Sequence, residues 1–136
     1  MIPSIEKVAV IGTGIIGSGW ATQFVMAGYP VNLYDVDDSR LDEVVGVVAS
    51  NLKYLREKGA GITDIDRALQ NLTTTNDLNK AVADASFIQE AIDENLDAKR
   101  ALLAEIERHA NDDAVFASSS SGFPISEIAS ESLHPE

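Results

Sequence analysis

The sequence predicts an α/β fold, a doubly wound parallel sheet with helices on both faces in three layers. Short apolar segments alternate along the chain with longer segments whose apolar residues recur at helical spacing. A glycine-rich turn joins the first apolar segment to the first helix. Because strands that alternate with helices are joined by right-handed crossovers, we expect parallel strands in the order 3-2-1-4-5.

Length and composition fit one domain over residues 1–136. The chain is 45% hydrophobic and 24% charged, which is usual for a globular protein. It has no cysteine, so disulfides and thiolate metal sites are excluded. Two histidines leave little for zinc, and we predict no metal site.

Charge and hydropathy limit the possible partners. A formal net charge of −12 argues against nucleic acid, whose phosphates would be repelled. No apolar run approaches the roughly 20 residues that span a membrane. Residues 1–4 lack the basic and apolar regions of a signal peptide. We therefore expect a cytoplasmic protein whose partner is a small molecule, with no nucleic acid and no membrane.

The first strand and the turn after it carry the most specific pattern. Residues 8–17 read Val-Ala-Val-Ile-Gly-Thr-Gly-Ile-Ile-Gly, a buried strand followed by G-x-G-x-x-G ahead of an amphipathic helix. In this pattern Gly12 allows the tight turn, Gly14 lets a pyrophosphate approach the backbone, and Gly17 lets the helix pack closely on the sheet. The phosphates then lie at the helix N-terminus.

A second element supports a dinucleotide ligand. Residues 30–34 read as a buried strand, and Asp35 ends it 18 residues after Gly17, where the pattern asks for an acidic residue after about 20. A carboxylate there accepts hydrogen bonds from the adenosine ribose and repels a 2′-phosphate, which favours NAD over NADP. The alternative role of Asp35 is a turn at the strand end. Arg40, the one nearby cation, is expected to extend to solvent.

The remaining elements follow in order. Apolar residues at helical spacing predict a helix over residues 38–58, after which glycines break the chain. Thr63 is a candidate N-cap for a short helix that contains Ile65, Ala68 and Leu69. The rest of the chain is predicted as a strand over 72–75, a short helix over 76–84, a strand over 86–92, a helix over 93–111, a strand over 114–118 and a short helix over 125–131.

Two further motifs follow the fourth and fifth strands, where ligands bind in such sheets. Residues 89–99 read Gln-Glu-Ala-Ile-Asp-Glu-Asn-Leu-Asp-Ala-Lys, and residues 117–122 read Ala-Ser-Ser-Ser-Ser-Gly. With the glycine turn and Asp35, they make the whole chain resemble the N-terminal Rossmann domain of the L-3-hydroxyacyl-CoA dehydrogenase superfamily. Within the superfamily, the sequence is most similar to the branch of lambda-crystallin, L-gulonate 3-dehydrogenase and L-carnitine dehydrogenase. The similarity lies in the Ser-Ser-x-Ser-Gly pattern, in residues 88–90 and in residues 134–136.

The resemblance implies roles for individual residues. Glu94 and Lys99 are implied to lie near the nicotinamide ribose, and Ser121 to contact the substrate hydroxyl. The alternative is a solvated glutamate and lysine beside a flexible serine turn. The cofactor NAD is then expected to contact Gly12, Gly14, Ile15, Ile16, Gly17, Asp35, Glu94, Lys99 and Ser119. Lys53, Arg56 and Lys58 match basic residues near CoA phosphates in the acyl-CoA branch, although a solubilising helix face explains them better.

The implied reaction is NAD-dependent oxidation of a 3-hydroxyacyl-CoA or small 3-hydroxy acid to the 3-keto product, as in fatty acid metabolism. In the family the catalytic histidine and the glutamate that orients it lie beyond the position of residue 136. A helical domain, which closes over the substrate and forms the homodimer, also follows there. We therefore expect this chain to bind the cofactor without turnover, and read His134 and His109 as structural. The alternative is a non-enzymatic NAD-binding crystallin-like or sensor protein.

The same resemblance implies that the sheet stops before the later strands of the family, the first of which would pair beside strand 114–118. Strand 114–118 would then be an edge with unpaired backbone groups, and apolar surface near Phe123 and Ile125 would be exposed. We expect the chain to self-associate through this edge, more strongly as salt screens the net charge.

Overall fold

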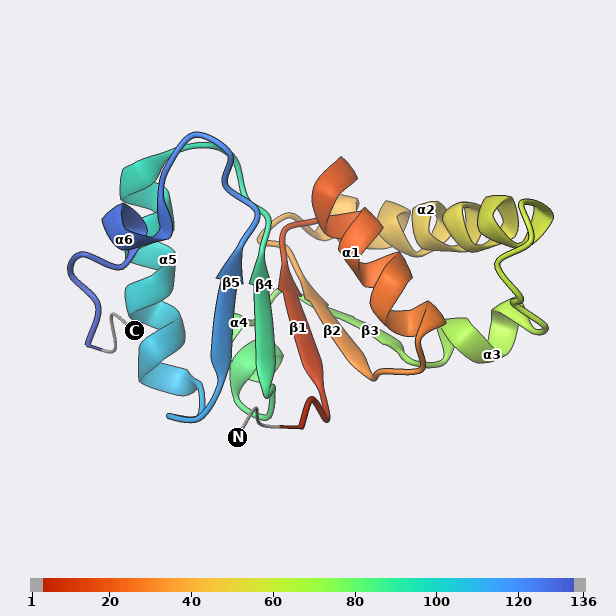
Figure 1. Cartoon of the computed structure of the whole chain (residues 1–136), viewed down its shortest axis with the longest axis horizontal. Coiled ribbons are helices and arrows are strands. Elements are labelled where there is room, and N and C mark those ends of the chain that lie inside the picture. Colours follow the sequence, from red (N-terminus) through yellow and green to blue (C-terminus); the bar gives the residue numbers. More distant parts are fainter. Residues whose placement is uncertain (1–3, 134–136) are drawn as a thin grey trace.

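A computed structural model describes residues 4–133 and contains one parallel five-stranded sheet. The order β3-β2-β1-β4-β5 confirms the predicted topology (Figure 1). The strands are β1 (Val8–Ile11), β2 (Val31–Tyr34), β3 (Leu72–Thr75), β4 (Phe87–Glu90) and β5 (Val115–Ser118).

Helices cover both faces of the sheet, which confirms the three layers (Figure 1). On one face lie α1, α2 and α3, and on the other lie α4, α5 and α6. Their bounds are α1 (Ile15–Met26), α2 (Asp38–Glu57), α3 (Ile65–Leu69), α4 (Leu78–Val82), α5 (Leu96–His109) and α6 (Ile125–Ile128). None of these helices is long and apolar enough to cross a membrane, within the part of the chain described.

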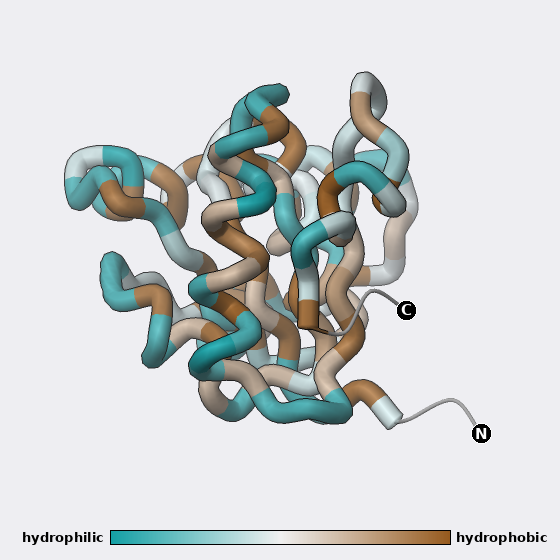
Figure 2. The backbone as a smooth tube through the Cα atoms, turned by 90° about the vertical axis from the view of Figure 1, so that its left-hand side faces the viewer, coloured by the Kyte–Doolittle hydropathy of each residue, from teal (hydrophilic) through white to brown (hydrophobic). Residues whose placement is uncertain are grey.

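Strand β1 divides the core, because successive side chains of a strand point to opposite faces. Val8 and Val10 pack with α1 and α2, whereas Ala9 and Ile11 pack toward α4 and α5. All four residues are fully buried, as expected for a central strand covered on both sides. Figure 2, seen from the α5 side, shows hydrophilic and hydrophobic residues alternating along the outer helices.

The strand register aligns the carboxyl ends of all five strands. One row across the sheet holds the last residue of each strand, namely Thr75, Tyr34, Ile11, Glu90 and Ser118. Backbone hydrogen bonds continue into the next row, which consists of Asp35, Gly12, Ala91 and Ser119. The glycine turn, Asp35 and the serine motif therefore lie side by side at the carboxyl ends of the strands.

Several predicted boundaries are too long. The strand predicted over 86–92 ends at Glu90, because the amide of Ile92 donates to the Glu90 side chain at 2.7 Å instead of continuing the ladder. The helix predicted over 93–111 begins after Asn95, whose side chain caps it by accepting from the amide of Ala98 at 3.0 Å. The helices predicted over 76–84 and 125–131 shorten to 78–82 and 125–128.

Two predictions about helices are wrong in detail. Asp64, not Thr63, caps α3, because its carboxylate accepts from the amide of Arg67 at 3.0 Å. Helix α1 is not amphipathic in the predicted sense, since Ser18 and Thr22 are buried while Ile15 is 91% exposed. The two buried hydroxyls donate to backbone carbonyls one turn earlier, so they need no water.

The far edge of the sheet is partly as predicted. Strand β5 lies at the end of the strand order, and its Val115 is 43% exposed. Ile125 is also exposed, whereas Phe123 is half-buried beside the small cluster of Leu103, Ile128 and Ala129. A groove of about 450 Å³ runs along this side between β5, α5 and α6. His134, which was predicted to be structural, lies outside the described residues.

Candidate functional site

The glycine turn has the geometry that the sequence predicts. Gly12 has a φ of +112°, and a Cβ there would lie 2.5 Å from the carbonyl oxygen of Ala91. A Cβ on Gly17 would overlap the carbonyl oxygen of Gly12. Both positions therefore exclude side chains for reasons of folding, namely the backbone conformation at Gly12 and close packing at Gly17.

Gly14 differs from these two glycines. A Cβ there would meet no atom within 4 Å, so the fold does not require glycine at this position. Gly14 is also the N-cap of α1 and offers no side chain to the first amides of the helix. The other helices longer than four residues in the described chain, α2 to α5, have an Asp or Asn side chain that accepts from such an amide. The first turn of α1 is thus left open for an external acceptor.

The carboxylate of Asp35 is fixed next to this turn. Its Oδ2 accepts from the hydroxyl of Thr13 at 2.6 Å and from the Thr13 amide at 3.3 Å, and its Oδ1 accepts from the amide of Asp37 at 2.9 Å. Only 8% of Asp35 is exposed. Burial, then the charges of Asp35 and Asp77, raise the pKa of the neighbouring Tyr34. Arg40 is exposed, as predicted, 3.9 Å from Asp37.

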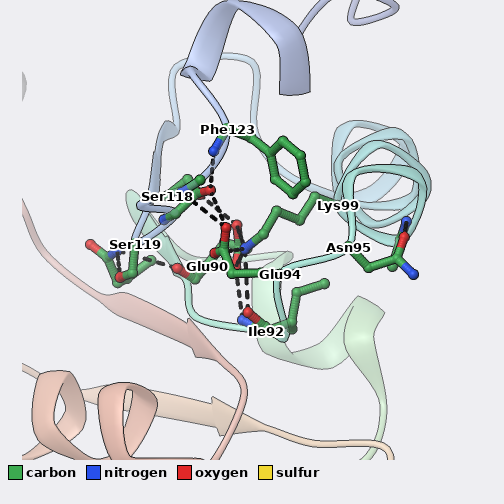
Figure 3. A network of polar contacts seen from close by, with 12 residues as sticks. Glu90, Ile92, Glu94, Asn95, Lys99, Ser118, Ser119 and Phe123 are labelled. Atoms are coloured by element: carbon green, nitrogen blue, oxygen red, sulfur yellow. Dashed lines mark hydrogen bonds and ion pairs between the residues drawn. The ribbon is translucent and has the colours of Figure 1, made fainter.

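A buried ion pair lies on the other side of the turn, between β4 and α5 (Figure 3). The ammonium of Lys99 is 2.8 and 2.7 Å from the two carboxylate oxygens of Glu90. Both residues are completely buried. Glu90 also accepts from the hydroxyl of Ser118 at 2.5 Å and from the amide of Ile92 at 2.7 Å, so that every polar atom of the pair has partners.

Glu94 connects this pair to the serine motif. Its Oε1 lies 3.4 Å from the ammonium of Lys99, and its Oε2 accepts from the hydroxyl of Ser120 at 2.8 Å and from the amide of Gly122 at 3.2 Å. The bond from Ser120, followed by those from Gly122 and Lys99, holds the pKa of Glu94 below its usual range. Glu94 is therefore a charged carboxylate whose side chain is 43% exposed.

Ser119 belongs to a different set of contacts. Its hydroxyl accepts from the side-chain amide of Gln89 at 2.7 Å and from the indole of Trp20 at 2.9 Å. Trp20 comes from α1 and is 39% exposed. The contact joins α1 to the end of β5. Ser119 therefore lies between the glycine turn and the group of Glu90, Glu94 and Lys99.

The structure brings together most of the residues predicted for the site. The glycine turn, Asp35, Glu94 and Ser119 lie at the carboxyl end of the sheet. Ser121 is exposed on the serine loop, next to the two residues that bind Glu94. Lys99 is near Glu94 but buried, and its contact with a cofactor stays a prediction. Lys53, Arg56 and Lys58 are exposed, as a solubilising face would be.

Sequence reasoning missed Thr13, Trp20, Glu90 and Ser118 as members of the site. For Glu90, a signal was available, because a glutamate at the end of a strand predicted to be buried needs a cation nearby. The spacing from Glu90 to Lys99 does not reveal that partner, since a loop and the first turn of α5 separate them. Thr13 and Trp20 carried no such signal.

These residues fit a dinucleotide. The space above Gly14 and the open first turn of α1 suit a pyrophosphate, and Asp35 stands one strand away, where an adenosine ribose would follow. On the opposite side, Glu94 and the serine loop provide acceptors and hydroxyls for a second ribose and its ring. Among the described residues no cluster of His, Asp and Glu could hold a metal ion.

Comparison with known proteins gives the same result. A sequence profile described as "3-hydroxyacyl-CoA dehydrogenase, NAD binding domain" matches residues 7–136. L-carnitine dehydrogenase of Streptomyces griseus is 37% identical over 96% of this chain and 38% of its own length. The Lambda-crystallin homolog of Mus musculus is 31% identical over 97% of this chain and 42% of its own length.

A solved structure extends the comparison to the fold. The 3-hydroxybutyryl-CoA dehydrogenase of Escherichia coli K12 superposes with a TM-score of 0.90 at 29% identity, over 98% of this chain and 28% of that one. Fold and site thus define an NAD-binding domain of the Rossmann type. More narrowly, the chain belongs to the family of 3-hydroxyacyl-CoA dehydrogenase NAD-binding domains. It spans about two fifths of the length of the curated relatives named above.

Proposed function

We propose that this domain binds NAD across the carboxyl ends of β2, β1 and β4. The pyrophosphate would lie over Gly14 and accept from the amides at the start of α1, at Ile15 and Ile16. Asp35 would accept from the hydroxyls of the adenosine ribose, because its carboxylate is fixed at the end of the neighbouring strand. The open space at Gly14, in a helix with no side-chain cap, carries this proposal.

The nicotinamide half would lie over β4 and β5. Glu94 offers a charged acceptor to the second ribose, and Ser119 faces the same region through its contact with Trp20. Ser121 would contact the hydroxyl of the substrate, since it is exposed on the serine loop next to Glu94. Bound NAD would supply the acceptor for a hydride from that substrate.

For the whole protein we propose an NAD-dependent dehydrogenase that oxidises a 3-hydroxyacyl-CoA or a small 3-hydroxy acid. The names of the relatives support this range of substrates, since they include L-carnitine dehydrogenase and 3-hydroxyacyl-CoA dehydrogenase. We further propose that the protein is cytoplasmic and a homodimer at full length. Removing the proton of the substrate hydroxyl requires a general base. We assign that step to residues outside this chain.

A non-enzymatic NAD-binding protein is the second candidate. The identity of 31% to the Lambda-crystallin homolog of Mus musculus supports this second candidate. A fold shared by both classes cannot separate them. Turnover by the whole protein would support the dehydrogenase, and NAD binding without turnover of any 3-hydroxy acid would support the binding protein.

Titration of the chain with NADH tests the binding proposal. Trp20 is the only tryptophan, and it contacts Ser119 at the proposed site. We therefore expect saturable quenching of its fluorescence with a stoichiometry of one. Calorimetry with the same ligand gives an independent measure of that stoichiometry. Absence of saturable binding in both experiments would overturn the proposal.

A further inference from the structure

The ion pair of Glu90 and Lys99 is not explained by stability alone. Both side chains are fully buried, and removing two charges from water is costly even when they meet in good geometry. A pair of apolar side chains of similar volume would fill the same space at lower cost. The pair instead fixes positions, because it joins the end of β4 to α5, and through the hydroxyl of Ser118 to the end of β5.

Lys99 has no donor left for a ligand. An ammonium group has three hydrogens, and the oxygens around Lys99 come from Glu90, from the carbonyl of Ile92 at 3.3 Å and from Glu94 at 3.4 Å. Its side chain is 1% exposed. Lys99 therefore acts on anything outside the protein through the carboxylate of Glu94, which lies beside it (Figure 3) and is 43% exposed.

Contacts continue from Glu94 along the serine loop. Its second carboxylate oxygen accepts from Ser120 and Gly122, and the hydroxyl of Ser120 accepts from the amide of Phe123 at 3.1 Å. The loop that carries Ser121 is thus held at both ends. At one end Ser118 donates to Glu90, and at the other the loop amides donate to Glu94 and Ser120.

We propose that Glu90 is a positioning residue for the nicotinamide half of the cofactor site. It touches neither cofactor nor substrate, but it fixes Lys99 and Ser118, and through them the carboxylate of Glu94 and the loop of residues 118–123. This inference rests on the proposed binding of NAD. Its consequence is selective, because the adenosine half depends on Asp35 and the glycine turn, and none of the hydrogen bonds that fix the Asp35 carboxylate involves the side chain of Glu90.

Two ligands separate the halves of the site. NADH occupies both, whereas ADP carries the adenosine and the two phosphates but lacks the second ribose and the nicotinamide. The variant Glu90→Gln keeps the shape of the side chain and removes its charge. We expect this variant to bind NADH about tenfold more weakly or worse, and ADP within about twofold of the unmodified chain. Equal weakening of both ligands, or no weakening of either, would overturn the proposal.

A second variant keeps the test decisive if Glu90→Gln does not fold, since an unpaired buried lysine is destabilising. Ser118→Ala leaves the ion pair in place and removes the hydroxyl that donates to Glu90 and accepts from the amide of Ser120 at 3.1 Å. It should also weaken NADH more than ADP, and a non-selective result or no change would again contradict the proposal. Ser86→Ala is the matched control, because it removes a serine hydroxyl that accepts from the amide of Glu6 at the opposite end of β4. We expect it to change the affinity for neither ligand.

The same data distinguish this inference from the proposed function. If the unmodified chain binds neither NADH nor ADP, the proposed cofactor site is wrong, and the role of Glu90 is wrong with it. If the unmodified chain binds both and the Glu90 and Ser118 variants show no selective loss, the cofactor site stands and only the positioning role is wrong.

Discussion

The hydroxyl of Thr13 donates to the carboxylate of Asp35 over 2.6 Å, which joins the glycine turn directly to the end of β2. The amide of Asp37 holds the other carboxylate oxygen. Asp35 is therefore oriented before any ligand arrives, and little side-chain entropy remains to be lost on binding. Oδ2 already accepts twice from Thr13, whereas Oδ1 accepts only from the amide of Asp37 and keeps a second lone pair for a ribose hydroxyl.

This geometry predicts the choice of cofactor. A fixed negative charge next to the adenosine ribose repels a 2′-phosphate, so NADH should bind about tenfold or more tightly than NADPH. Asp35→Ala should weaken NADH and narrow the gap between the two. Fluorescence titration of Trp20 measures both affinities. Equal affinities in the unmodified chain would remove the role assigned to Asp35.

The glycines of the turn predict opposite phenotypes. Gly14→Val places a side chain where the structure has open space, so the fold should persist in circular dichroism while NADH binding is lost. Gly17→Ala puts a Cβ against the backbone of Gly12, so it should destabilise the protein by about 1–3 kcal/mol or more. Urea unfolding of both variants distinguishes them. Retained NADH binding in folded Gly14→Val would place the pyrophosphate elsewhere.

The glycine turn was predictable from sequence because its constraints are local. Gly12 is required by its own positive φ and Gly17 by the backbone of Gly12 five residues earlier. Asp35 follows at a distance set by one helix and one strand. The parallel sheet followed from the alternation of elements, and its strand order followed from the Rossmann-like first half; both are correct. The boundaries failed where side chains such as those of Asn95 and Asp64 cap the helices, and the predicted amphipathic character of α1 failed because its buried face carries Ser18 and Thr22.

The buried part of the site was not predictable in the same way. Glu90 and Lys99 were visible in the sequence, but their contact depends on how α5 packs against β4. The resemblance pointed to Lys99 as a cofactor ligand, and the structure shows a buried side chain surrounded by oxygens. Burial and partners at that level come from tertiary packing, which spacing does not report.

The lowered pKa of Glu94 predicts a dependence of stability on pH. Its pKa in the folded protein lies below that of the unfolded chain, chiefly because Ser120 donates to it. The resulting stabilisation is present above the unfolded pKa and is lost as the pH falls through the folded pKa. Ser120→Ala should therefore cost stability at neutral pH and less in acid. Urea unfolding in both conditions checks this, and a difference that grows in acid would contradict it.

Activity gives a further prediction. The chain should bind NADH yet not oxidise 3-hydroxybutyryl-CoA, L-gulonate or L-carnitine above background, because we assign the general base to residues outside it. His109 is the last residue of α5, just before the start of β5, whereas the serine loop follows the end of β5; its imidazole lies 3.8 Å from Glu105. An assay that follows NADH absorbance tests this. Turnover by this chain would show that its own residues supply the base.

The exposed edge at β5 predicts self-association. This strand pairs only with β4 among the described strands, Val115 is exposed on it, and the groove beside it is lined by apolar residues that include Phe116 and Ile125. An edge strand of this kind can pair with a second chain. Because the net charge of −12 opposes contact between copies, association should increase with protein concentration and with ionic strength. Sedimentation velocity at two protein and two salt concentrations measures it. Val115→Lys should shift the distribution to monomer, as charged edge residues do, while NADH binding is unchanged. A monomer in all four conditions would show that this edge is not a contact surface between copies of the chain.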